Sequence, residues 1–154
     1  MKSYKDLVAQ ALPNINELFP WDAQSYLKAH PETLVLDIRE PDEFQAVRVE
    51  GSINVPRGIL ESACEYDYEE TVPELAEART RPILIVCRSG NRSILAADTM
   101  GQMGYREVYS LKTGLKGWND FELPLVDGND AAVDGDDADR YFTAHLRPEQ
   151  LGRR

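Results

Sequence analysis

The chain has very few residues of the kinds that build disulfide scaffolds or metal sites. Its 154 residues include two cysteines and two histidines. Two cysteines can form at most one disulfide, which is too few for a cross-linked scaffold. Neither residue type occurs at the CxxC or HxxxH spacing of zinc ligands, so a zinc site is not expected. A free thiol placed in a distinctive loop then becomes the candidate for chemistry.

Long apolar runs and excess positive charge are also lacking. The longest purely apolar run is ILIVC at 83–87, far too short to span a membrane. The first residues, MKSYKDLVAQAL, carry an aspartate where a signal peptide would need apolar residues. The formal net charge of -10 argues against nucleic acid or an anionic membrane as the main partner. We therefore expect a soluble, cytoplasmic protein that binds neither nucleic acid nor membrane.

What is present is an alternation of strand-like and helix-like segments. With 42% hydrophobic residues, the chain can bury the core of one domain. Apolar or β-branched segments predict strands at 33–38, 52–56, 83–87 and 107–111. Helical spacing predicts helices near 3–12, 21–30, 39–47, 57–78, 93–105 and 137–146, and the stretch 112–120 is expected to be a loop that leads into a short helix. This alternation predicts an α/β domain with a mainly parallel sheet.

Both ends of the chain look like additions to that domain. We predict an N-terminal helical extension at 1–15, a domain at 16–125, and an acidic linker with a helical segment at 126–154. The linker is rich in aspartate and poor in bulky apolar residues, so we expect it to be solvated. The last helix has an apolar face that we expect to pack on this domain or on a second copy, as a homodimer, and it comprises Tyr141, Phe142, His145 and Leu146.

Cys87 stands where the apolar segment 83–87 gives way to a polar loop, CRSGNR. In a parallel α/β sheet, sites lie beyond the carboxyl ends of the strands. The loop can curl so that its N–H groups form an anion-binding nest, and Gly90 gives it the freedom to do so. The helix N-terminus, with Arg88 and Arg92, adds positive charge. Such surroundings favour a thiolate.

A free cysteine at a strand end can also be a small packed hydrophobe. The two arginines, the glycine and the strand–loop–helix context favour a nucleophile instead. The remaining loop residues would supply backbone or hydroxyl donors to a bound anion, and they are Ser89, Asn91 and Ser93.

The stretch CRSGNRS, with LVLDIREPDEF before it and GLKGW after it, resembles a single-domain rhodanese, a sulfurtransferase. SINVP adds weaker support, and the similarity extends over about residues 16–125. This resemblance implies a rhodanese-like α/β fold, with a central, mainly parallel five-stranded sheet flanked by helices on both faces. It also implies that the charged groups of Asp37 and Arg39, with Glu43, belong to a supporting network near the site.

The resemblance implies a thiosulfate sulfurtransferase that works through a persulfide on Cys87. The thiolate would take the outer sulfur of thiosulfate or of a persulfide donor and pass it to cyanide or a thiol acceptor. That acceptor is a small molecule or a sulfur-carrier protein. Arg88 and Arg92 would bind the sulfonate end of the donor, and the loop from Arg88 to Ser93 would hold the persulfide. No cofactor and no metal are implied.

Three other functions remain open from the sequence. Related cell-cycle phosphatases place five residues between cysteine and arginine, whereas this loop has four, which argues against phosphate chemistry. A non-enzymatic binding or regulatory module would not need Cys87 with both arginines. A redox sensor would need a resolving thiol, and the only other one is Cys64, whose acidic neighbours should raise its pKa.

Two positions near the loop depart from the usual pattern of this family. Residues 47–49 read VRV where many relatives have GHI, and Thr113 stands where many have the first of two glycines. Lys112 and Lys116 lie in the segment that approaches the site in relatives, so they could touch an acceptor.

Overall fold

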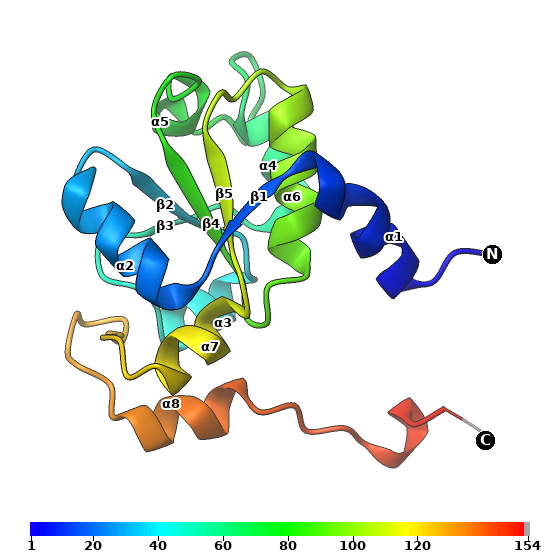
Figure 1. Ribbon diagram of the computed structural model, residues 1–154, viewed down its shortest axis with the longest axis vertical. Helices are drawn as coiled ribbons and strands as arrows, with labels where there is room; N and C mark the ends of the chain where they lie inside the picture. The colour runs from blue at the N-terminus through cyan, green and yellow to red at the C-terminus, as the bar shows by residue number, and fades with distance from the viewer. Residues whose placement is uncertain (153–154) are drawn as a thin grey trace.

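The computed structural model describes residues 1–152, and within them a five-stranded sheet has the strand order β1-β5-β4-β2-β3. Every strand pair is parallel, which confirms the expected α/β architecture with a five-stranded parallel sheet (Figure 1). The strands are β1 Asn16–Leu18, β2 Leu34–Asp37, β3 Ile53–Asn54, β4 Ile83–Val86 and β5 Val108–Leu111. The α-helices are α1 Tyr4–Ala11, α2 Pro20–Ala29, α3 Pro41–Ala46, α4 Leu60–Ala63, α5 Pro73–Ala76, α6 Arg92–Gln102, α7 Gly114–Asp120 and α8 Gly135–Phe142.

The two central strands are buried on both faces. Every residue of β2 and of β4 is buried, as their nearly continuous apolar sequences predict for a covered parallel sheet. Their register places Asp37 beside Val86. The chain enters the CRSGNR loop at the carboxyl end of β4. Because β4 is the central strand, this loop begins at the centre of the sheet.

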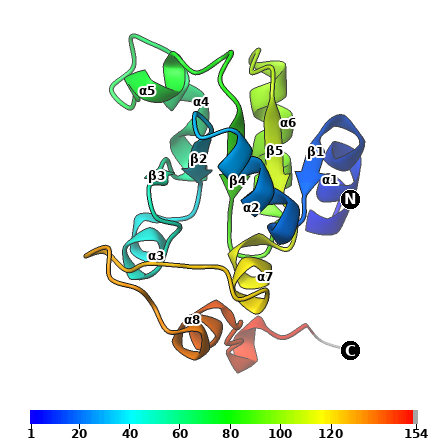
Figure 2. The same cartoon turned by 60° about the vertical axis from the view of Figure 1, so that its left-hand side comes forward.

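Helices cover both faces of the sheet (Figures 1 and 2). On one face, Leu36 and Ile85 pack with apolar side chains of α4, α5 and α6, including Met100. On the other, Val35 and Leu84 pack with side chains of α2, α7 and α8. Because neighbouring strand residues point to opposite faces, one run of apolar residues supplies both cores.

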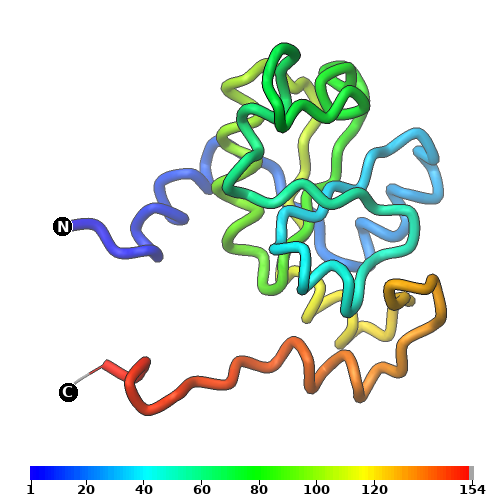
Figure 3. Tube along the Cα trace, turned by 180° about the vertical axis from the view of Figure 1, so that it is seen from behind, coloured from blue at the N-terminus to red at the C-terminus, as the bar shows by residue number. Residues whose placement is uncertain are grey.

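The terminal segments pack on the domain from outside the sheet. The helix α1 begins with the capping box expected from Ser3 and Asp6, and a short 3₁₀ turn, Leu12–Asn14, joins it to β1. The helix α8 lies against α7, followed by another 3₁₀ turn at Pro148–Gln150. Figure 3 shows that α1 and the last described residues of the chain lie on the same side of the molecule.

Four predictions differ from the structure, and they concern β1, the stretch 57–78, the last helix and the acidic linker. The strand β1 was not expected, since NEL has no β-rich pattern, and it forms because β5 offers an edge to pair with. The acidic stretch 57–78 holds the short helices α4 and α5 and a 3₁₀ turn at Arg57–Ile59 rather than a long helix. The last helix starts and ends earlier than expected, so its packing residues are Ala138 and Phe142.

The face predicted for that last helix is therefore wrong in part. Phe142 is buried, whereas Tyr141, His145 and Leu146 are exposed. The linker is also only partly solvated, because Val126 is buried and pairs with Arg48 and Ala132. No helix among residues 1–152 is both long enough and apolar enough to cross a membrane.

Candidate active site

The loop 87–91 connects the central strand β4 to the helix α6 and curls around the sulfur of Cys87. The N–H of Gly90 donates to Sγ of Cys87 at 3.2 Å, and the N–H of Ser93 does so at 3.4 Å. Cys87 itself is fully buried. Two backbone donors directed at one sulfur stabilise it when it carries negative charge. This arrangement places the thiol at the floor of a nest, as the nucleophile hypothesis requires.

Two serine hydroxyls continue the hydrogen-bond network below the sulfur. The hydroxyl of Ser93 lies 3.4 Å from Sγ of Cys87 and 2.7 Å from the hydroxyl of Ser110. Both serines are fully buried. Ser110 was not among the expected site residues, although it occupies the carboxyl end of β5, beside β4. The sequence signal that could have identified Ser110 is its place as a lone serine near the carboxyl end of a predicted parallel strand.

Close packing of backbone against backbone holds the loop in place. Gly90 has φ +91, and a Cβ there would come within 3.0 Å of the amide nitrogen of Thr113. On the other side of this contact, Gly114 has φ +64, and its Cβ would lie 2.6 Å from the amide nitrogen of Ser89. Only glycine fits at either position.

The N-terminus of α7 also caps the loop. The N–H of Leu115 donates to the carbonyl of Cys87 at 2.9 Å, and the N–H of Lys116 donates to the carbonyl of Arg88 at 3.0 Å. These bonds satisfy donors that a helix N-terminus would otherwise leave unpaired. The loop carbonyls are thereby turned away from the sulfur, so the N–H groups on the opposite side can point inward.

The two arginines of the loop have different surroundings. Arg92 forms a two-point ion pair with Glu43 of α3, with N–O distances of 3.0 and 3.1 Å. Although burial alone would raise the pKa of Glu43, hydrogen bonds and charge from Arg92 lower it below its ordinary value. Arg88 is half-buried and makes no ion pair with residues 1–152. Of the two loop arginines, Arg88 is therefore the one whose charge no carboxylate of residues 1–152 offsets.

Asp37 and Arg39 form a fully buried ion pair next to the loop rather than in it. Oδ2 of Asp37 accepts from Nη2 of Arg39 at 2.7 Å, and Oδ1 accepts from Nε at 3.0 Å. Nη2 of Arg39 also donates to the carbonyl of Val47 at 2.6 Å, and its guanidinium lies 6.0 Å from the ring of Phe142. The pair therefore ties the end of β2 to the segments after α3 and in α8.

The second cysteine is buried in the core. Cys64 follows α4 and is fully buried, and both cysteines are free thiols. Burial raises the pKa of the Cys64 thiol, and the charges of Glu61 and Glu65 act in the same direction. Acidic neighbours were expected to cause this rise, but burial is the larger cause. A thiol kept protonated is a weak nucleophile.

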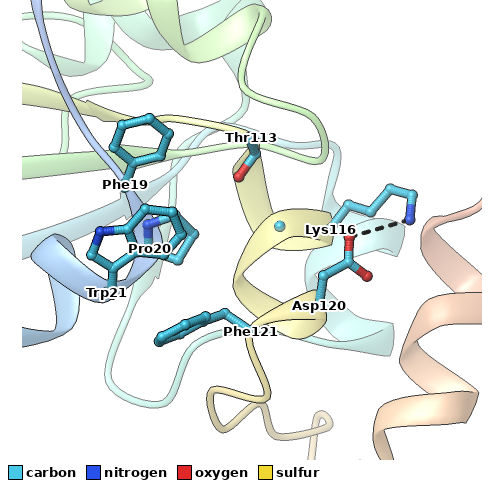
Figure 4. Close-up of a pocket in the computed structure, with 8 residues that line it drawn as sticks. Phe19, Pro20, Trp21, Thr113, Lys116, Asp120 and Phe121 are labelled. Atoms are coloured by element: carbon cyan, nitrogen blue, oxygen red, sulfur yellow. Dashed lines mark ion pairs between the residues drawn. The ribbon is translucent and has the colours of Figure 1, made fainter.

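An aromatic pocket of about 340 Å³ lies beside the loop, between α2 and α7 (Figure 4). Its rings stack or tilt against one another at centroid distances of 4.7 and 5.2 Å. Nζ of Lys112 lies 4.7 Å from the centroid of one of these rings, that of Phe19, and Lys116 forms an ion pair with Asp120 at its rim. The pocket is lined by Phe19, Pro20, Trp21, Thr113, Lys116, Gly117, Asp120 and Phe121.

Residues 22–121 match the protein family described as Rhodanese-like domain. The sequence is 30% identical over 90 residues to thiosulfate sulfurtransferase GlpE of Tolumonas auensis, covering 57% of this chain and 74% of that protein. Matches to other curated relatives cover 63–64% of those proteins' length, so the chain spans just under two thirds of them.

Two solved structures share the fold. A protein of unknown function from Rhodopseudomonas palustris, described as a possible tyrosine phosphatase, superposes with a TM-score of 0.73 at 28% identity, covering 80% of this chain and 94% of that one. The polysulfide-sulfur transferase homodimer from Wolinella succinogenes superposes with a TM-score of 0.61 at 28% identity, covering 80% and 87%.

Proposed function

Because the chain belongs to the rhodanese-like domain family, we propose that it is a thiosulfate sulfurtransferase that carries sulfane sulfur on Cys87. The observation that supports this most directly is the pair of backbone N–H groups, from Gly90 and Ser93, that point at Sγ of Cys87. Backbone donors fixed before reaction stabilise a thiolate or persulfide without reorganising. Sulfurtransferase names among the relatives agree with this chemistry.

In the first half of the reaction, the Cys87 thiolate attacks the outer sulfur of thiosulfate. A new S–S bond forms, the bond between the two sulfurs of thiosulfate breaks, and sulfite leaves with its electron pair. The product is a persulfide anion on Cys87, so charge is conserved without any proton transfer. The loop N–H groups that held the thiolate then hold the terminal sulfur.

In the second half, a nucleophile removes the terminal sulfur and regenerates the thiolate. Cyanide would leave as thiocyanate, and a thiolate acceptor would leave as a persulfide of its own. The cycle is ping-pong, with one covalent intermediate. We propose a small anionic sulfur donor, with a thiol acceptor that is either a small molecule or a sulfur-carrier protein.

The two arginines would act differently in this cycle. Arg88 has no carboxylate partner in the described structure and can bind the sulfonate end of the donor. Each Nη atom of Arg92 gives one N–H group to Glu43, and the carboxylate offsets the charge of the guanidinium, so Arg92 would attract an anionic donor less strongly than Arg88 does. We therefore assign donor binding first to Arg88 and the positioning of the loop to Arg92.

The test is the intact mass of the protein after incubation with thiosulfate. Wild type and Cys64→Ser should each gain one sulfur atom that cyanide removes, whereas Cys87→Ser should gain none. Cys64→Ser is the matched control because it removes the other thiol. An unchanged wild-type mass with both thiosulfate and glutathione persulfide would contradict the proposal.

The same proteins should be tested for hydrolysis of p-nitrophenyl phosphate, since one structural relative is described as a possible tyrosine phosphatase. The loop holds four residues between Cys87 and Arg92, so we expect no turnover. Cys87-dependent hydrolysis without sulfur uptake would replace the sulfurtransferase proposal with a phosphatase.

A further inference from the structure

The helix α1 places its first residue near the catalytic loop. Its capping box, in which Ser3 and Asp6 satisfy each other's backbone N–H groups, fixes Tyr4 as the first helical residue. The helix packs on α6, and Asn14 just beyond it donates to Asp98 of α6 at 3.3 Å. Figures 1 and 3 show α1 and α6 rising in the same direction, so both begin at the end of the sheet where Cys87 lies.

The side chain of Tyr4 shares a cavity with a residue of the loop. Tyr4 and Asn91 line a cavity of about 260 Å³, whose other walls come from α1 and the turn after it. Tyr4 is half-exposed, at 51%, so its ring borders both the cavity and the solvent. Asn91 is the last residue of the loop before α6, so the cavity that it shares with Tyr4 borders the loop.

The hydroxyl of Tyr4 is a protonated donor that no group in the described structure uses. Burial raises its pKa, and negative charge on Cys87 raises it further, while Arg92 and Arg88 lower it. The influence of these three loop residues agrees with the placement of Tyr4 at the loop. A phenol whose pKa is raised keeps its proton at neutral pH and can donate it to an anion.

We propose that Tyr4 is a substrate-binding residue whose hydroxyl donates a hydrogen bond to the anionic end of the sulfur donor. This inference rests on the function proposed above. Tyr4 lies outside residues 22–121, which match the family, so the N-terminal extension adds a donor that the family domain does not supply. Glu43 offsets the charge of Arg92, so among the described residues we assign the side-chain contacts to the anion first to Arg88 and Tyr4.

The first measurement is the second-order rate constant for persulfidation of Cys87 by thiosulfate, followed by intact mass. Tyr4→Phe should lower it about tenfold, as expected when one hydrogen bond to a charged group is removed. Tyr4→Phe keeps the ring, so the packing of α1 is preserved. Tyr68→Phe is the matched control, because Tyr68 is exposed to a similar degree at 53% and lines a different pocket.

The second measurement does not depend on sulfur transfer. The rates at which iodoacetate, an anion, and iodoacetamide, a neutral analogue, alkylate Cys87 are measured by peptide mass. We expect Tyr4→Phe to lower the iodoacetate-to-iodoacetamide ratio several-fold, with the iodoacetamide rate within about twofold of wild type. Tyr68→Phe should leave both rates unchanged.

The alkylation ratio decides between the outcomes. A ratio in Tyr4→Phe equal to that of wild type overturns the inference, whatever happens to sulfur transfer. A lowered ratio in a protein that accepts no sulfur from any donor supports the anion-binding role of Tyr4 and contradicts the proposed function alone. Normal sulfur uptake in Tyr4→Phe with an unchanged ratio overturns the inference and leaves the proposed function intact.

Discussion

Glu43 of α3 accepts two parallel N–H···O bonds, of 3.0 and 3.1 Å, from Arg92, the first residue of α6. They are separated by 49 positions in the sequence. Bidentate pairing of this kind fixes the orientation of a guanidinium more strictly than a single contact does. The start of α6, and with it the end of the loop 87–91, is therefore anchored to α3.

Replacing Glu43 by Gln should destabilise the protein by about 1 kcal/mol at pH 7, since one partner of a partly exposed ion pair is lost. Gln can still accept the capping hydrogen bond that Glu43 takes from the N–H of Glu40. Urea unfolding at several pH values provides the measurement.

The pH dependence follows from the lowered pKa of Glu43. Because the folded pKa lies below the ordinary value of 4.5, the stabilisation is complete above that value and is lost as pH falls through the folded pKa. The difference between wild type and Glu43→Gln should therefore shrink below about pH 4.5. If the difference in the free energy of unfolding between the two proteins stays constant down to about pH 3, this explanation is contradicted.

Gly114→Ala should be severely destabilising. A Cβ at Gly114 would lie 2.5 Å from the carbonyl carbon of Arg88 and 2.6 Å from the amide nitrogen of Ser89, so backbone must move. We expect a loss of roughly 3 kcal/mol or more, as for strained backbone and overpacking together, and slower alkylation or persulfidation of Cys87. Gly101→Ala in α6 is the control, because a Cβ there meets nothing within 4 Å. Equal stabilities of the two variants would argue against the close approach.

Thr113→Gly should stabilise the protein. Thr113 has φ +67, a left-handed conformation that is strained for a β-branched residue. Glycine removes the strain but gains unfolded-state entropy, so the net gain should be about 0.5–1 kcal/mol. Asp67→Gly, at φ +74, should gain less, because aspartate tolerates this conformation better. A melting temperature lowered by Thr113→Gly would show that the threonine makes a compensating contact.

Asp37→Asn should cost about 3–5 kcal/mol, because it leaves the charge of Arg39 buried without its carboxylate. Both side chains have no exposed surface. Glu61→Gln breaks the exposed Arg57–Glu61 pair and should change stability by less than about 0.5 kcal/mol. The free energies of unfolding from denaturant titration distinguish the two. A small loss in Asp37→Asn would mean that Arg39 finds another partner.

The double variant Asp37→Leu/Arg39→Met tests the same pair without leaving a lone charge. Replacing a whole buried pair by apolar residues is often close to neutral, so the double variant should be more stable than Asp37→Asn. If it is less stable, the pair contributes through its hydrogen bonds to the backbone, such as that to Val47.

The alternation of strands and helices after β1, and the position of the CRSGNR loop at the end of β4, could be predicted from the sequence. Local patterns carry this information, because strands buried on both faces need continuous apolar residues and a polar loop after one of them ends at the sheet edge. The strand β1 could not be predicted this way, because Asn16–Leu18 forms a strand only by pairing with β5. The start of α8 was missed although it has a local signal, because the side chain of Asp134 caps the helix by accepting from the N–H groups of Asp136 and Asp137.

The sequence by itself determined the α/β class, the helix start at Ser3, and the thiol at the end of ILIV, because each depends on residues adjacent in the chain. Tertiary structure alone decided which arginine is free, because Glu43 reaches Arg92 only after α3 and α6 are placed side by side. It also decided that Ser110 supports Ser93, that Gly114 packs on the loop, and that Tyr4 lies beside Asn91. Contacts between distant segments depend on how the layers pack, and no local pattern specifies that packing.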